Sequence, residues 1–236
     1  MANKKNKVNF LCSACGDDFA KWHGQCPSCK EWGTLSEFKV LGNKSVKRSK
    51  LDYRDYKSLN DILDSDPGER ITTSILEADR VLGGGLLPGS LLLLGGSPGV
   101  GKSTLALHIC SGVNKPILYV SAEESEQQVA IRAKRINVKS DNLNLSSEND
   151  LNGILTHIDR ISPSLVVIDS IQTIINSDLD SLPGSPSQIR DCGQKFLEVS
   201  KQNNVIIIIV GHVTKEGTIA GPKMLEHMVD LSLIHI

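Results

Sequence analysis

A glycine-rich run is the first feature of the sequence whose residue types could do chemistry. Residues 95–104 read GGSPGVGKST and follow four consecutive leucines. From Gly96 to Ser103 the run fits GxxxxGK[ST], the pattern of a loop that surrounds nucleotide phosphates with backbone N–H groups at the start of a helix. We expect Lys102 to reach the β- and γ-phosphates and Ser103 to bind Mg²⁺. The expected ATP-binding residues are Gly96, Ser97, Pro98, Gly99, Val100, Gly101, Lys102, Ser103 and Thr104.

Two carboxylates could complete such a site. Asp169 ends the aliphatic run LVVID, as in a Walker B element, and we expect it to join Ser103 in holding Mg²⁺. The alternative is an aspartate that caps a turn. Glu123 in YVSAEES follows another aliphatic run, and we expect it to orient the water that attacks ATP, with Glu124 as the alternative. Both glutamates could instead favour the N-terminus of the next helix.

A histidine lies at the same predicted edge of the sheet. Val205–Val210 is a continuous aliphatic run followed by Gly211 and His212. Because ligands bind beyond the carboxyl ends of parallel strands, His212 could sense the γ-phosphate, although a structural histidine explains it equally well. The predicted catalytic residues are Lys102, Glu123 and His212.

Four cysteines near the N-terminus have the spacing of a metal site. They form two CxxC pairs with ten residues between them: Cys12, Cys15, Cys26 and Cys29. Two such turns can direct four thiolates at one tetrahedral Zn²⁺, and four cysteines leave no open position for water, so the zinc is expected to be structural. Gly16 can supply the positive backbone angle that the turn needs. Because so short a segment buries little core, zinc should supply much of its folding energy.

Two tryptophans flank the second cysteine pair. We expect Trp22 and Trp32 to cover the metal turns, with base stacking as the alternative. Cys110 and Cys192 lie in helix-like segments, and we predict that they are ordinary core residues.

The charge of the chain is unevenly distributed. The net charge of its 236 residues is -1, but residues 1–57 carry 12 Lys/Arg against 6 Asp/Glu. This basic arm could meet nucleic acid or be a solvated linker. The sequence has no apolar run long enough to cross a bilayer and no secretion signal. We therefore expect a cytoplasmic protein without a membrane partner, in which cysteines bind metal rather than form disulfides.

Alternating strand and helix patterns predict a doubly wound, mostly parallel α/β sheet. The predicted strands are Leu91–Leu94, Ile117–Val120, Leu143–Leu145, Leu165–Ile168 and Val205–Val210. The predicted helices are Lys102–Val113, Glu126–Ile136, Asp150–Ile161 and Gln188–Gln202. The predicted domains are a four-cysteine finger at 1–38, a basic linker at 39–57 and an ATPase core at 58–230.

Several of these stretches together carry a family resemblance. The run ITTSILEADRVLGGGLLPGSLLLLGGSPGVGKSTL resembles RecA/DnaB/KaiC-type ATPase cores. The cysteine pattern with Trp22, Gly24 and Trp32 is similar to the zinc finger of the bacterial RadA (Sms) family. Further matches are YVSAEES, PGSPSQIRD and GHVTKEGTIAGPKMLEHMVD. The resemblance extends from about residue 10 to Asp230 and implies a RecA-like P-loop core behind a zinc finger.

The resemblance also implies a function. RadA proteins are DNA-dependent ATPases that form hexameric rings and carry out branch migration with a RecA-type recombinase during DNA repair. By position, residues 177–191 and 214–228 match loops that face single-stranded DNA, with Arg190, Lys215 and Lys223 as the expected phosphate contacts. A KaiC-like regulatory ATPase and a RecA-like strand-exchange recombinase remain alternatives.

The last six residues, LSLIHI, depart from the family pattern. They are what the codons CTG TCT CTT ATA CAC ATC encode, a transposase end sequence that is common in sequencing adapters. Our hypothesis is that residues 231–236 are a non-native tail and that the native frame is cut at Asp230. The family's Lys-Asn-Arg-Phe-Gly segment would then be missing. We accordingly expect this chain to bind ATP. Its hydrolysis of ATP and its assembly into rings should both be poor.

Overall fold

The computed structural model describes residues 8–39, 58–60, 69–138, 141–212 and 224–235. The chain divides into two units, residues 1–67 and 68–236, and each is described by itself. The predicted linker at 39–57 lies, apart from Lys39, outside the described residues. No described helix is both long enough and apolar enough to cross a membrane.

The first unit holds a small antiparallel sheet. Its strands are β1 (Val8–Cys12), β2 (Asp18–Phe19) and β3 (Leu35–Lys39), in the order β2-β1-β3. Cys12 pairs with Leu35 across β1 and β3, and both pack with Cys26 in a small buried cluster. Two of these three residues are predicted metal ligands, so the core of this unit is largely its sulfur cluster.

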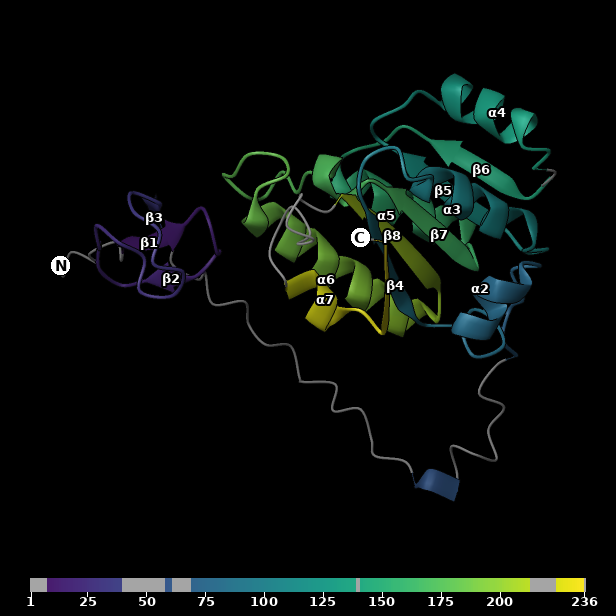
Figure 1. The fold of residues 1–236 in the computed structure, drawn as a ribbon, viewed down its shortest axis with the longest axis horizontal. Helices are drawn as coiled ribbons and strands as arrows, with labels where there is room; N and C mark the ends of the chain where they lie inside the picture. Colours follow the sequence, from purple (N-terminus) through teal and green to yellow (C-terminus); the bar gives the residue numbers. More distant parts are fainter. Residues whose placement is uncertain (1–7, 40–57, 61–68, 139–140, 213–223, 236) are drawn as a thin grey trace. The chain divides into compact units, whose positions relative to one another are not determined.

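The second unit is built on a parallel sheet of six strands among the described residues (Figure 1). Their order is β6-β5-β7-β8-β4-β9, and every adjacent pair is parallel. The strands are β4 (Leu91–Gly96), β5 (Ile117–Ser121), β6 (Leu143–Ser146), β7 (Leu165–Asp169), β8 (Ile206–His212) and β9 (Leu231–His235). The predicted parallel α/β fold is therefore confirmed.

Helices cover both faces of the sheet. They are α2 (Leu76–Val81), α3 (Lys102–Ser111), α4 (Glu126–Arg135), α5 (Leu151–Ile161), the short 3₁₀ helix η1 (Ile171–Thr173), α6 (Pro186–Asn203) and α7 (Met224–Met228). Helix α6 begins two residues before the predicted start. The Ser185 side chain accepts a hydrogen bond from the Gln188 N–H, and Pro186 lies at the first helical position, where its missing N–H costs nothing.

Alternate residues of the four central strands, β4, β5, β7 and β8, enter two different cores. Leu91 and Leu93 pack with α5 and α6, whereas Leu92 and Leu94 pack with α3 and α4. Buried strands covered on both faces explain the unbroken aliphatic runs in the sequence. Cys110 and Cys192 are fully buried, one in each core, and burial raises the pKa of each thiol to about 12. They are core residues, as predicted.

The last described strand, β9, contains most of the predicted tail. It runs parallel to β4, with Leu231 opposite Leu92, and Leu231 and Leu233 pack partly buried against the core. Asp230 leads into it and is held by Leu91, whose N–H donates to the carboxylate at 2.8 Å. The origin of residues 231–236 stays a prediction, because strand pairing does not depend on where a sequence comes from.

Candidate nucleotide site and metal centre

Neighbouring strands bring the predicted site residues to one edge of the sheet. Gly96 of β4 is opposite His212 of β8, while Asp169 of β7 is opposite Val210 of β8 and Ser121 of β5. The carboxyl ends of β5, β7, β8 and β4 therefore follow one another along this edge. This is where parallel α/β sheets bind ligands.

The glycine-rich loop connects β4 to α3. Gly99 and Gly101 have φ angles of 80° and 98°, in the left-handed region that side chains disfavour. Lys102 is only 7% exposed, and its ammonium donates hydrogen bonds to the carbonyls of Gly96 and Ser97, each at 2.9 Å. Burial lowers the pKa of Lys102, and this is opposed by the nearby carboxylates. The loop thus holds the partly desolvated Lys102 ammonium against its own backbone carbonyls.

The remaining loop residues are open to a ligand. Pro98 and Val100 are exposed, while Ser103 and Thr104 are half-buried in the first turn of α3. The first backbone N–H groups of a helix have no partner within the helix, so this terminus can receive phosphate oxygens. All nine predicted ATP-binding residues therefore lie on one continuous stretch from the last residue of β4 through the loop to the start of α3.

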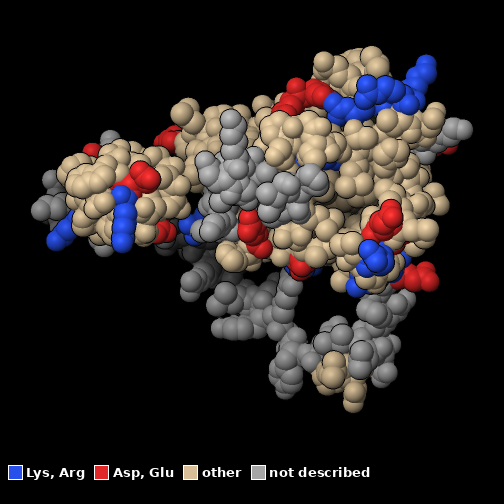
Figure 2. Space-filling view, viewed as in Figure 1, with Lys and Arg blue, Asp and Glu red and all other residues tan. Residues whose placement is uncertain are grey.

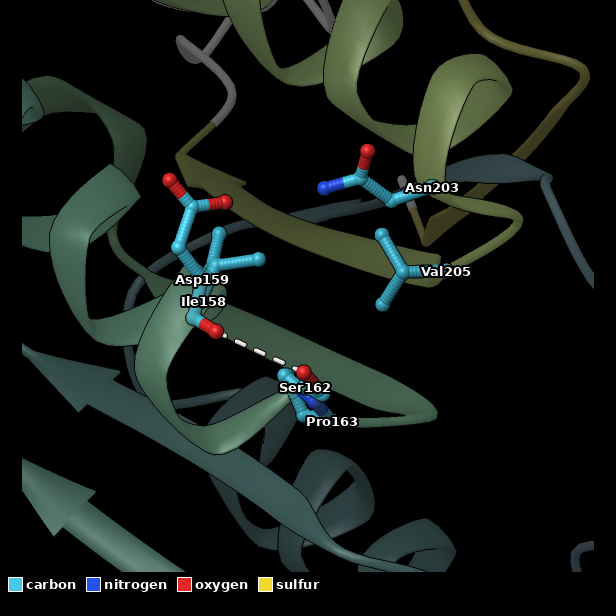
Figure 3. A pocket seen from close by; sticks show the side chains of 6 residues that line it. All are labelled: Ile158, Asp159, Ser162, Pro163, Asn203 and Val205. Carbon is cyan, nitrogen blue, oxygen red and sulfur yellow. Dashed lines mark hydrogen bonds between the residues drawn. The ribbon is translucent and has the colours of Figure 1, made fainter.

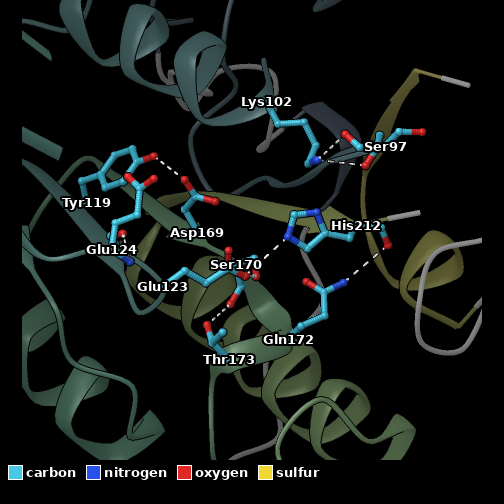
Figure 4. A network of polar contacts seen from close by, with 12 residues as sticks. Ser97, Lys102, Tyr119, Glu123, Glu124, Asp169, Ser170, Gln172, Thr173 and His212 are labelled. Carbon is cyan, nitrogen blue, oxygen red and sulfur yellow. Dashed lines mark hydrogen bonds and ion pairs between the residues drawn. The ribbon is translucent and has the colours of Figure 1, made fainter. Parts of the chain in front are cut away.

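The predicted magnesium ligand Asp169 has a partner that was not predicted from the sequence. Tyr119 is fully buried in β5, and its hydroxyl donates to Asp169 Oδ2 at 2.6 Å (Figure 4). Burial raises the pKa of Tyr119, and the Asp169 carboxylate raises it further, so the phenol keeps its proton and is the donor. Asp169 itself is 9% exposed.

Glu123 lies between the ends of three strands. The Ser170 hydroxyl donates to Glu123 Oε1, and His212 Nε2 lies 3.4 Å from the same oxygen (Figure 4). The other ring nitrogen of His212, Nδ1, is buried and has no hydrogen-bond partner among the described residues. His212 is therefore not a fully satisfied structural histidine in the part of the chain that is described.

The neighbouring glutamate has a different role. Glu124 forms an ion pair with Arg132 of α4, and its N–H donates to Ser121 Oγ at 3.3 Å. The N-terminus of α4 is capped by Ser125, whose side chain forms a capping box with Gln128, and not by either glutamate. Because Glu124 is held by Arg132, Glu123 is the glutamate that faces the other predicted site residues.

The predicted DNA contacts are only partly described. Arg190 lies on α6 and is exposed, whereas Lys215 and Lys223 lie outside the described residues. Figure 2 shows Lys and Arg side chains gathered over the α4 edge, where the last helical turn carries Arg132, Lys134 and Arg135. Cations at a helix C-terminus complement its dipole, which is a sufficient reason for this cluster.

A pocket elsewhere on the ATPase unit contains none of the predicted site residues. The pocket lies at the amino ends of β7 and β8 (Figure 3). Its lining residues are Ile158, Asp159, Ser162, Pro163, Asn203 and Val205. It lies at the opposite end of these strands from Asp169 and His212.

The four predicted zinc ligands come together in the first unit. Their sulfur atoms all lie within 4.8 Å of one another, with Cys12 Sγ 3.7 Å from Cys29 Sγ and Cys15 Sγ 3.6 Å from Cys26 Sγ. Four thiolates bound tetrahedrally at about 2.3 Å from zinc would be about 3.8 Å apart. The sulfur positions therefore fit a four-thiolate Zn²⁺ site.

The two CxxC turns have nearly the same backbone. The N–H of Gly16 donates to the Cys12 carbonyl and that of Lys30 to the Cys26 carbonyl, both at 2.9 Å. Their φ angles are 79° and 62°. The prediction for Gly16 is confirmed, and Lys30 adopts the same conformation although it carries a side chain.

The thiols differ in how readily they ionise. Burial raises the pKa of Cys15 to about 12. At Cys12 burial acts in the same direction, but the Thr34 hydroxyl, 3.2 Å away, and nearby backbone groups lower the pKa to about 6. Binding of zinc as thiolates therefore has to release protons from this cluster.

The tryptophans do not cover the metal turns, so that prediction was wrong. Trp22 is 61% exposed and Trp32 is 73% exposed, and neither belongs to the buried cluster around the cysteines. They flank Gly24 instead, where an added Cβ would lie 3.6 Å from one ring and 3.7 Å from the other. Phe10, Phe19 and Leu35 pack against the sulfur cluster in their place.

The fold and these sites define a RecA-like P-loop ATPase core preceded by a zinc-binding finger. The AAA domain family matches residues 62–218, and the rubredoxin metal binding domain matches residues 10–37. The chain therefore belongs to the AAA domain family. Among solved structures, an ATPase domain has a similar fold, with a TM-score of 0.62 at 15% identity over 76% of this chain and 84% of that one.

Curated relatives carry the name DNA repair protein RadA. That of Listeria monocytogenes is 45% identical over 99% of this chain and 52% of its own length. Those of Haemophilus influenzae and Bacillus subtilis are each 42% identical, over 98% and 97% of this chain and 52% of their own lengths. These matches confirm the resemblance to the RadA family. The chain spans about half the length of the curated relatives it matches.

Proposed function

We propose that this chain is the finger and ATP-binding core of a DNA-dependent ATPase that processes recombination intermediates by branch migration in DNA repair. The observation that carries the proposal is the meeting of Lys102, Asp169, Glu123 and His212 at one sheet edge, in a chain similar to DNA repair proteins named RadA. The two Cys pairs add a structural zinc finger to that core.

ATP binding would use the loop and the start of α3. Lys102 would exchange the carbonyls of Gly96 and Ser97 for phosphate oxygens, which are stronger acceptors for a desolvated ammonium. Ser103 and Asp169 would hold Mg²⁺, which neutralises charge on the phosphates when it is bound. The donor set fits this ion, because a hydroxyl and a carboxylate are oxygen ligands.

Hydrolysis would use the cluster around Glu123. Its carboxylate would orient a water molecule for attack, and Ser170 and His212 would restrict its rotation through contacts to Oε1. His212 would also place its ring beside the last phosphate, because it is opposite Gly96 at the base of the loop. Lys102, Glu123 and His212 form the proposed catalytic set.

DNA would be held by basic residues of the segments that match the family's DNA-facing loops. Arg190 is the described candidate, and Lys215 and Lys223 are proposed from the resemblance alone. Cations that contact phosphates give affinity without reading sequence. By the same resemblance, we propose that the complete protein forms hexameric rings in the cytoplasm and acts with a RecA-type recombinase.

The test is ATP hydrolysis by the complete protein with and without single-stranded DNA at low salt. Stimulation by DNA is expected in the wild type and should be lost in Glu123→Gln. A branch-migration assay on a DNA junction then separates a motor from a regulatory ATPase. An ATPase rate that DNA does not change at low salt would contradict any DNA-dependent role.

A further inference from the structure

Tyr119 and Asp169 lie on neighbouring strands and on the same face of the sheet. Tyr119 is opposite Val167 in the pairing of β5 with β7, and Asp169 is two residues further along β7. Tyr119 and Val167 both pack in the core beneath α3 and α4. The phenol therefore reaches diagonally across two strands from within the apolar core to the carboxylate at the sheet edge.

We infer that Tyr119 is a positioning residue that orients the Asp169 carboxylate toward Mg²⁺. The inference rests on the proposed function, in which Asp169 is a magnesium ligand. The phenol engages Oδ2 at 2.6 Å, and Oδ1 is the oxygen that can turn toward the ion. Tyr119 is fully buried, so it would act on the site only through Asp169.

A neutral donor suits this task better than a cation. An arginine or lysine at this position would fix the carboxylate but would also neutralise the charge that attracts Mg²⁺. The phenol hydroxyl fixes one oxygen and leaves the full negative charge in place. Partners that hold metal ligands typically contribute about 10- to 100-fold to metal affinity.

The test is Mg²⁺ affinity in the full chain rather than turnover. Binding of a fluorescent ATP analogue is followed while Mg²⁺ is added, for wild type and Tyr119→Phe. The expected result is that Tyr119→Phe needs about tenfold more Mg²⁺ for half-maximal effect. Its affinity for the analogue in EDTA should equal that of the wild type, because the loop and Lys102 are unchanged.

Ser200→Ala is the matched control for removing a buried hydroxyl. Ser200 lies on α6, its side chain is fully buried, and its Oγ has no hydrogen-bond partner among the described residues. This variant should leave the Mg²⁺ requirement unchanged. Circular dichroism and thermal melting verify that each variant is folded.

A second measurement separates positioning from a general effect of the mutation. In an Asp169→Asn background, Tyr119→Phe should cause no further change in the Mg²⁺ requirement, because the carboxylate through which Tyr119 acts is already absent. A full additional loss in that background would overturn the inference. So would an unchanged Mg²⁺ requirement in Tyr119→Phe alone. If wild type binds the analogue without any response to Mg²⁺, the proposed function of the site itself fails.

Discussion

Glu123 Oε1 lies 3.4 Å from His212 Nε2, although Glu123 follows β5, His212 ends β8, and β7 lies between these two strands. Ser170, just after β7, donates its hydroxyl to the same carboxylate oxygen. One side chain at or just after the carboxyl end of each of three neighbouring strands thus takes part in this contact. The carboxylate is held at the sheet edge while Glu124, beside it in sequence, is held by Arg132.

Glu123→Gln should therefore separate ATP binding from hydrolysis. The amide keeps the size of the side chain but cannot accept a proton, so we expect hydrolysis by the complete protein to fall about 10²- to 10⁴-fold with ATP affinity little changed. Single-turnover hydrolysis of labelled ATP measures the effect. Glu124→Gln is the matched control, since it weakens the ion pair with Arg132 and should slow hydrolysis far less. Equal losses in the two variants would contradict the assignment.

Gly16→Ala should weaken zinc binding by the first unit. Gly16 has a φ of 79°, and a side chain in this region costs about 1 kcal/mol, which corresponds to roughly fivefold in affinity. Competition with a chromogenic chelator measures the zinc affinity. Gly24→Ala is the control, because a Cβ there makes only ordinary contacts at 3.6 Å. An unchanged affinity in Gly16→Ala, or a larger loss in Gly24→Ala, would refute the explanation.

Gly112→Ala should destabilise the ATPase unit. A Cβ at Gly112, at the end of α3, would lie 2.2 Å from the backbone carbonyl oxygen of Thr73, which cannot move without shifting the chain. Overpacking of this kind costs about 1–3 kcal/mol in the free energy of unfolding. Urea denaturation measures it. At Gly153 the nearest group, 2.7 Å away, is the flexible Glu148 side chain, so Gly153→Ala should lose less stability.

The strands and their edge residues could be predicted from the sequence because both depend on local pattern. Runs such as Val205–Val210 are aliphatic without interruption because both faces of β8 are buried. Asp169 and Glu123 were placed together because carboxyl ends of parallel strands share one edge. Helix α4 begins at the predicted Glu126, capped by Ser125, whereas the Ser185 cap places the start of α6 two residues before the predicted one.

Contacts that depend on strand order could not be predicted in this way. The hydrogen bond between Tyr119 and Asp169 requires that β5 lie next to β7, and this strand order cannot be predicted from the local sequence pattern. A tyrosine two residues before the end of a buried strand was the available signal. The left-handed backbone conformation at Lys30 could not be predicted, because lysine disfavours a positive φ angle. Trp22 and Trp32 were expected over the metal turns because they flank the second cysteine pair in sequence, and nearness in sequence does not determine which way a side chain packs.

The most direct test of the central claim is equilibrium binding of Mg²⁺ and a fluorescent ATP analogue to Lys102→Ala. Loss of the buried ammonium removes charge-assisted hydrogen bonds worth about 1.5–3 kcal/mol, so affinity should fall roughly 10- to 100-fold. Lys195→Ala is the matched lysine control, because Lys195 makes an exposed ion pair with Glu198 on α6, and this variant should bind the analogue as the wild type does. Wild-type affinity in a folded Lys102→Ala protein would contradict the claim that this loop is the ATP site.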